Sequence, residues 1–103
     1  MQRFYGYKLG QYAGREYSLS VNGAPSIDAV EEFAVTVHYY DTDTDETIEI
    51  ARIDTAHGVT HFDKLFRRSQ PKETLDVDYL DAERRLRENW RRYARSYEQL
   101  HGD

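Results

Sequence analysis

Four side chains that can carry acid–base chemistry lie within ten positions of the sequence. They are Asp54, His57, His61 and Asp63, and they include two of the four histidines of the chain. Histidine exchanges protons near neutral pH, and a carboxylate can orient it. These residue types predict metal-independent cleavage of a phosphodiester. The expected catalytic residues are His57 and His61 for the acid–base steps, Asp54 for orienting a histidine, and Arg52 for holding the phosphate.

The same cluster allows two other interpretations. In a structural role, Asp54 and His57 would cap a turn, His61 would satisfy a local hydrogen bond, and Asp63 would form an ion pair. In a metal site, histidine and carboxylate would be suitable ligands, although this spacing matches no strong metal signature. We therefore expect neither a metal nor a cofactor to be required, and we keep all three interpretations open.

A second group of functional candidates is a run of arginines near the C-terminus. Residues 84–95 contain six arginines and one glutamate, which gives this segment a charge of +5. Because the whole chain has a net charge of −5, the other 91 residues together carry −10. Arginine binds phosphate through two parallel hydrogen bonds and stacks on bases. The predicted RNA-binding residues are Arg84, Arg87, Arg91, Arg95, Arg67 and Arg68. A solvated helix face, or a face that docks on an acidic partner, is the alternative.

The elements that must position these residues begin with strands. Tyr17, Leu19 and Val21 alternate with serines, and residues 32–40 alternate in the same way, with β-branched and aromatic side chains. A polar, acidic segment over residues 41–46 favours a hairpin turn before the next strand, 47–54. Further strands are expected over residues 3–9 and 59–66. Asn22-Gly23 is typical of a turn, Pro25 would close that segment, and residues 26–31 suit a loop or a helical turn.

A helix follows the strands. Apolar side chains recur from Tyr79 to Leu100 at intervals of three and four, which is the period of a helix with one buried face. Asp76 or Asp78 can cap its first turn. The chain therefore divides into a strand-rich segment 1–66, a loop 67–76 and a helix 77–101, within a single domain 1–103. The predicted fold class is α+β: a small curved antiparallel sheet of about four to five strands, covered by one long C-terminal helix.

Composition excludes several classes of protein. The chain has no cysteine, so disulfide scaffolds, zinc-thiolate folds and thiol enzymes are not expected. It contains no apolar run long enough to span a membrane and no segment that resembles a signal peptide, so we expect a cytoplasmic protein without membrane contact. Eleven arginines against three lysines, with an excess of acid, favour a haloarchaeal origin.

The segment 51–58, together with the later His61 and Asp63, resembles the TumE-like toxins of toxin–antitoxin pairs and is similar to small archaeal proteins. Those toxins have roughly this length, a strand-rich first half and an R-[YW]-D-N-A-x-H segment. Arg52, Asp54 and Ala56 match that segment at its own spacing, and His57 corresponds to its histidine one position earlier. Ile53 replaces the aromatic residue, Thr55 replaces the asparagine, and the later histidines of the family are reduced to His61.

The resemblance implies a toxin that acts on RNA and is neutralised by a small helix-turn-helix antitoxin. A homodimer or a hetero-complex is expected in either case. The alternative function is a non-catalytic interaction or oligomerisation module of an acidic protein, in which the acidic loop and the arginine helix would meet between subunits.

Overall fold

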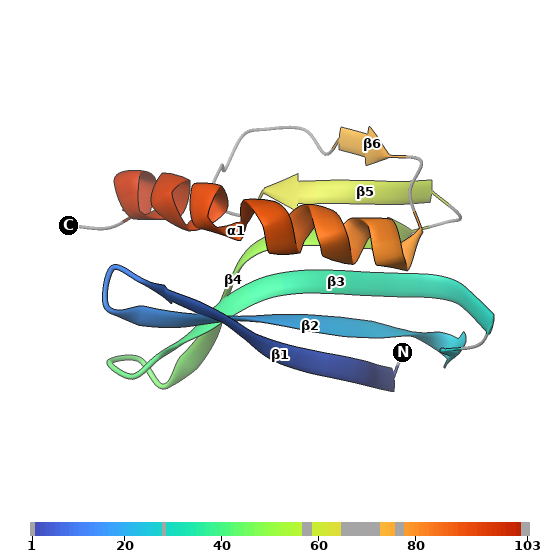
Figure 1. Ribbon diagram of the computed structural model, residues 1–103, viewed down its shortest axis with the longest axis horizontal. Coiled ribbons are helices and arrows are strands. Elements are labelled where there is room, and N and C mark those ends of the chain that lie inside the picture. The colour runs from blue at the N-terminus through green and yellow to red at the C-terminus, as the bar shows by residue number, and fades with distance from the viewer. Residues whose placement is uncertain (1, 28, 57–58, 65–72, 76–77, 102–103) are drawn as a thin grey trace.

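The fold is a six-stranded antiparallel sheet with a single helix on one face (Figure 1). This computed structural model describes residues 2–27, 29–56, 59–64, 73–75 and 78–101. Neighbours in the sheet follow the order of the chain, so the strands form a meander. The elements are β1 (Gln2–Tyr12), β2 (Arg15–Ser26), β3 (Ala29–Asp41), β4 (Glu46–Ala56), β5 (Val59–Lys64), β6 (Glu73–Leu75) and α1 (Tyr79–His101). The predicted α+β class, with a C-terminal helix covering a curved antiparallel sheet, is confirmed.

Two tight turns set the register of the first hairpins. Ala13 and Gly14, between β1 and β2, both have positive φ, 54° and 77°. Such a pair matches the twist of the flanking strands, and glycine adopts the conformation without a steric cost. In the β3–β4 tip, the backbone N–H of Asp43 donates to Asp41 Oδ1 at 3.0 Å. The acidic segment therefore forms the predicted hairpin turn.

Strand alternation separates an apolar face from a polar face. Tyr17, Leu19 and Val21 on β2 lie opposite Tyr39, Val37 and Val35 on β3, and all six side chains are buried. Strands β1 to β4 all contact α1. The buried residues of β2, β3 and β4 form one core with Ala82, Leu86, Trp90, Tyr93 and Ala94 of the helix. Along each strand, the side chains that alternate with these buried residues point to the other face of the sheet, which α1 does not cover. We call this side the open face.

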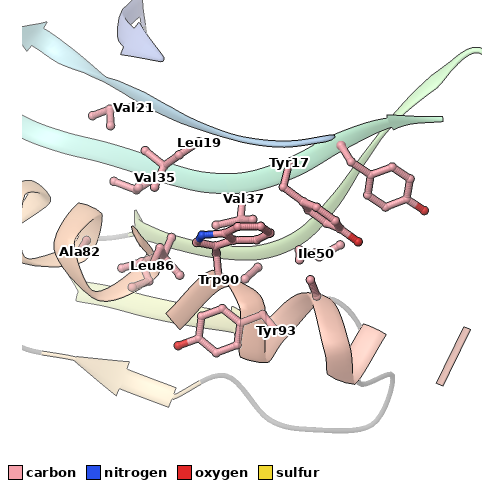
Figure 2. Packing of buried hydrophobic residues seen from close by; sticks show 14 of the residues in the cluster. Tyr17, Leu19, Val21, Val35, Val37, Ile50, Ala82, Leu86, Trp90 and Tyr93 are labelled. Carbon is pink, nitrogen blue, oxygen red and sulfur yellow. The ribbon is translucent and has the colours of Figure 1, made fainter. Parts of the chain in front are cut away.

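The helix begins as its sequence indicates. The backbone N–H of Asp81 donates to Asp78 Oδ1 at 2.8 Å, so Asp78 is the capping residue. Its apolar stripe packs against the strands, and the indole of Trp90 projects toward Val37 and Tyr17 (Figure 2). In the described part of the chain, no helix combines the length and the apolar character that crossing a bilayer requires.

Three details of the predicted elements are wrong. The expected turn at Asn22-Gly23 is part of β2, where Gly23 pairs with Phe33. Glycine is needed there for close approach, because a Cβ would lie 2.5 Å from Cε2 of Phe4. Residues 26–31 are predicted to form a loop or a helical turn, but Ser26 ends β2, Ile27 lies in a turn, and β3 already begins at Ala29. The predicted loop 67–76 contains β6, which pairs with β5 and adds a sixth strand.

Candidate functional site

The open face of the sheet gathers most of the polar side chains on β2 and β3. Ser20 and Thr36 are opposite each other in the register, as are Ser18 and His38. Ser20 and Thr36 are buried although both are polar. Buried hydroxyl groups need hydrogen-bond partners. We therefore expect hydrogen bonds between side chains on this face in place of hydrogen bonds to water.

Two of the predicted catalytic residues, Arg52 and Asp54, lie on the same open face. They alternate along β4 with the buried Ala51 and Ile53. Arg52 Nη1 lies 3.3 Å from Glu49 Oε2, and Arg52 Nε lies 3.8 Å from Asp54 Oδ2. The guanidinium is therefore held between two carboxylates, so an incoming phosphate would have to compete with them.

The predicted histidines are described only in part. The register of β4 and β5 pairs Asp54 with His61 and Arg52 with Asp63. The backbone thus brings three members of the predicted cluster, Asp54, His61 and Asp63, to adjacent positions on neighbouring strands, together with Arg52. His57 lies outside the described residues. Among the side chains that the structure describes, no three acidic, histidine or cysteine groups are placed to hold a metal ion.

The arginines of α1 fall into two groups, while Arg67 and Arg68 lie outside the described residues. Toward the start of the helix, Arg84 pairs with Asp81 at 3.2 Å and Arg87 with Glu83 at 3.7 Å.

The second group lies toward the other end of α1. There Arg91 donates to the backbone carbonyl of Gln11 at 3.3 Å and lies over the indole of Trp90. Within the described residues, Arg92 and Arg95 form no ion pair. We call the surface beside them the arginine hollow; it is lined by Tyr12, Arg91, Arg92, Arg95, Ser96 and Gln99.

The arginine hollow and the open face lie on opposite sides of the molecule. Ala51 and Ile53 are buried between the sheet and α1, so Arg52 and Asp54 lie on the side away from the helix. The arginines lie on the solvent side of that helix. The described arginines of α1 and the two described catalytic candidates, Arg52 and Asp54, therefore lie on two separate surfaces.

A cluster that the sequence did not indicate lies on the open face beside β1. Arg3 Nη2 donates to Ser20 Oγ at 3.2 Å, and Ser20 Oγ lies 2.7 Å from His38 Nε2. We call these three residues the serine–histidine cluster. Arg3 reaches this face because of a β-bulge between Arg3 and Tyr5, which interrupts strict alternation. The alternation of β2 and β3 could have paired Ser18 and Ser20 with Thr36 and His38, but nothing in the sequence indicates the bulge.

His38 is half-buried, and its surroundings favour the neutral ring. Burial lowers the pKa of His38 below its usual value; nearby Glu49 raises it, and Arg3 lowers it further. A neutral ring with an unprotonated Nε2 accepts a hydrogen bond from the Ser20 hydroxyl, whose oxygen accepts one from Arg3. The hydroxyl is thus polarised between an acceptor and a cation.

Comparison with known protein families identifies a match over almost the whole chain. A family model described as a domain of unknown function (DUF7718) matches residues 2–103. No curated protein and no solved structure matches the chain.

Proposed function

The chain belongs to the DUF7718 family, and we propose that it acts on RNA, which it binds through the arginine hollow. The observation that carries this proposal is the grouping of Arg91, Arg92 and Arg95 beside Tyr12, on a chain whose net charge is −5. Within the described residues, Arg92 and Arg95 have no acidic partner, so their charge is available to an external anion.

The lining of the hollow suits a single strand of RNA. Guanidinium groups bind phosphate oxygens in pairs, and an aromatic ring such as that of Tyr12 stacks on an unpaired base. Arg91 already stacks on Trp90, with its guanidinium carbon 4.7 Å from the ring centroid, which fixes the orientation of the group. Gln99 and Ser96 also line the hollow, where their amide and hydroxyl groups would be available to hydrogen-bond the RNA.

Replacing Arg92 and Arg95 together by alanine is expected to weaken the binding of a short single-stranded RNA roughly tenfold at low salt, because two phosphate contacts are lost. The plot of log affinity against log salt concentration has a negative slope, and its magnitude should decrease by about 1.4 when two phosphate contacts are lost. Fluorescence anisotropy over a salt series measures both quantities. Arg84→Ala is the matched control, since Arg84 lies on the same helix but pairs with Asp81. Equal losses in the control and in the double variant would contradict the assignment of the hollow.

We further propose that bound RNA is cleaved by metal-independent acid–base catalysis at the β4–β5 hairpin. His57 and His61 would exchange the protons, Asp54 would orient a histidine and Arg52 would hold the phosphate. The pairing of Asp54 with His61 in the register supports this arrangement. Because this hairpin lies across the sheet from the arginine hollow, the RNA would have to pass around an edge of the sheet. The resemblance to TumE-like toxins supports a toxin role, with a small helix-turn-helix antitoxin as partner.

The double variant His57→Ala, His61→Ala is expected to lose RNA cleavage and growth arrest on expression while keeping RNA affinity, because the binding arginines lie elsewhere. Gel analysis of a labelled RNA in the presence of a chelator, together with growth curves, measures the effect. Undiminished cleavage by the double variant would contradict the mechanism. Wild-type protein that neither binds nor cleaves RNA at low salt, but forms a stable oligomer in sizing experiments, would favour the interaction module instead.

A further inference from the structure

We propose that the open face of the sheet contains a second binding site, centred on the serine–histidine cluster, for a small phosphate monoester such as a nucleoside monophosphate. Two adjacent hollows meet at Arg3, Ser20 and His38, with volumes of about 230 and 240 Å³. The site is separated from the arginine hollow by the sheet and α1, and the proposal does not depend on RNA binding.

The first hollow has the chemistry of a phosphate subsite. Besides the serine–histidine cluster, it is lined by Lys8 and Ser18, which gives it two cations, two serine hydroxyl groups and no carboxylate. Lys8 Nζ also lies 3.4 Å from Oε1 of Glu16, an exposed side chain that is not part of this lining. Among the described residues, Arg3 has no acidic partner and makes one hydrogen bond, to Ser20 Oγ. A guanidinium carries five N–H donors, so most of its donors remain for a ligand. The guanidinium of Arg3 is held over the hollow by the hydroxyl of Ser20. This placement favours the binding of an anion in the hollow.

Gly6 keeps the space above Ser20 open. It lies opposite Ser20 in the β1–β2 register and lines the first hollow. A Cβ at Gly6 would lie 3.6 Å from Ser20 Oγ and 3.1 Å from the backbone oxygen of Leu19. A side chain there would thus cover the hydroxyl that the ligand has to reach.

The cluster can change its hydrogen bonding to receive an anion. Without ligand, the Ser20 hydroxyl donates to His38 Nε2, at a separation of 2.7 Å. An anion beside Arg3 favours the protonated imidazole, whose Nε2–H then donates to Ser20 Oγ. The hydroxyl is released to donate to the phosphate. The charged and titratable groups facing His38 are Arg3 and Lys8 from β1 and Glu49 from β4.

The second hollow suits the uncharged part of the ligand. It is lined by the same three residues together with Asn22, Thr36, Thr47 and Glu49. The Glu49 carboxylate would repel a phosphate but accepts hydrogen bonds from sugar hydroxyls or an exocyclic amine. Amide and hydroxyl groups there can donate or accept. The difference in charge between the two hollows therefore orients a ligand with phosphate at one end and hydroxyl or amino groups at the other.

The test is titration of the full-length protein with 5′-AMP, followed by calorimetry and by NMR of the backbone amides and the His38 ring. Inorganic phosphate and adenosine are the comparison ligands. We expect AMP to bind more tightly than either and to shift the resonances of Ser20 and His38. Arg3→Gln should weaken AMP binding at least about tenfold, and Arg3→Lys should restore part of it. Arg92→Ala, on the other side of the molecule, should leave AMP affinity unchanged.

Three results would overturn the proposal. They are the absence of AMP binding at millimolar concentration, equal affinity for AMP and inorganic phosphate, and shifts confined to the arginine hollow. Because the wild-type NMR titration needs no variant, it remains decisive if Arg3→Gln fails to fold. Weaker RNA binding by the double variant Arg92→Ala, Arg95→Ala with AMP binding intact would show that the two sites are independent.

Discussion

Replacing Trp90 by alanine is expected to lower the free energy of unfolding by about 4 kcal/mol, the largest effect of any single substitution considered for this chain. Trp90 is 6% exposed and lies at the centre of the contact between α1 and the sheet. Its ring centroid is 5.3 Å from that of Tyr17, and a Cβ at Gly10 would approach it within 3.1 Å. Strand backbone and aromatic rings surround the indole, so its removal leaves a cavity that cannot easily collapse.

Urea unfolding followed by circular dichroism measures this loss, since the substitution removes the only tryptophan and its fluorescence. Leu80→Ala is the control. Leu80 is on the same helix but 54% exposed, so its truncation should change stability by less than about 0.5 kcal/mol. A loss for Trp90→Ala no greater than for the control would contradict the packing described.

Replacing Glu83 by alanine is expected to be destabilising by about 3 kcal/mol. Glu83 is an acid on the sheet-facing side of α1, 8% exposed. Its carboxylate oxygens accept hydrogen bonds from the hydroxyl groups of Tyr5 at 2.5 Å and Tyr7 at 2.6 Å. Removing the carboxylate leaves both phenols without the group that accepts their hydrogen bonds, and it leaves Arg87 without its ion pair to Glu83 at 3.7 Å. Burial and the hydrogen bond to Glu83 raise the pKa of both Tyr5 and Tyr7, so both phenols remain donors throughout the neutral range.

A double-mutant cycle separates the hydrogen bond from the burial. Tyr7→Phe in the Glu83→Ala background should cost less than Tyr7→Phe alone, because its partner is already absent. Glu88→Ala provides the control on the exposed side of the same helix, with an expected change of less than about 0.5 kcal/mol. Additive effects of the two substitutions in the cycle would show that the Tyr7–Glu83 contact does not contribute to stability.

Much of the fold could be predicted from local patterns. Alternation over residues 17–21 and 33–39 identified the apolar face of two strands, because a strand buried on one side repeats every second residue. The helical stripe through Leu86 and Trp90 was equally direct. The turn predicted at Asn22-Gly23 is wrong because the glycine has a different role there. It lies within a strand, where its missing side chain leaves room for the ring of Phe4. Close approach between distant segments leaves no local signal.

The candidate sites were predictable only where residues lie close in the sequence. The run of arginines was visible as a charge pattern, but only the fold shows that Arg84 is paired and that Arg92 and Arg95 lie beside Tyr12. The serine–histidine cluster joins three different strands through a β-bulge, and a bulge changes the face of every residue before it. That change cannot be inferred from alternation, which assumes an uninterrupted strand.

The meander has a consequence for the order in which the molecule assembles during synthesis. Each strand pairs with its predecessor in the chain, so hairpins can close as soon as they emerge from the ribosome. The apolar face of the sheet has no cover until α1, which follows all six strands, has been made. Until then, side chains that are buried in the folded protein, such as Tyr17, have no helix to cover them. The docking of Trp90 is therefore the step that covers the apolar face, and it has to wait for the element that follows all the strands in the chain.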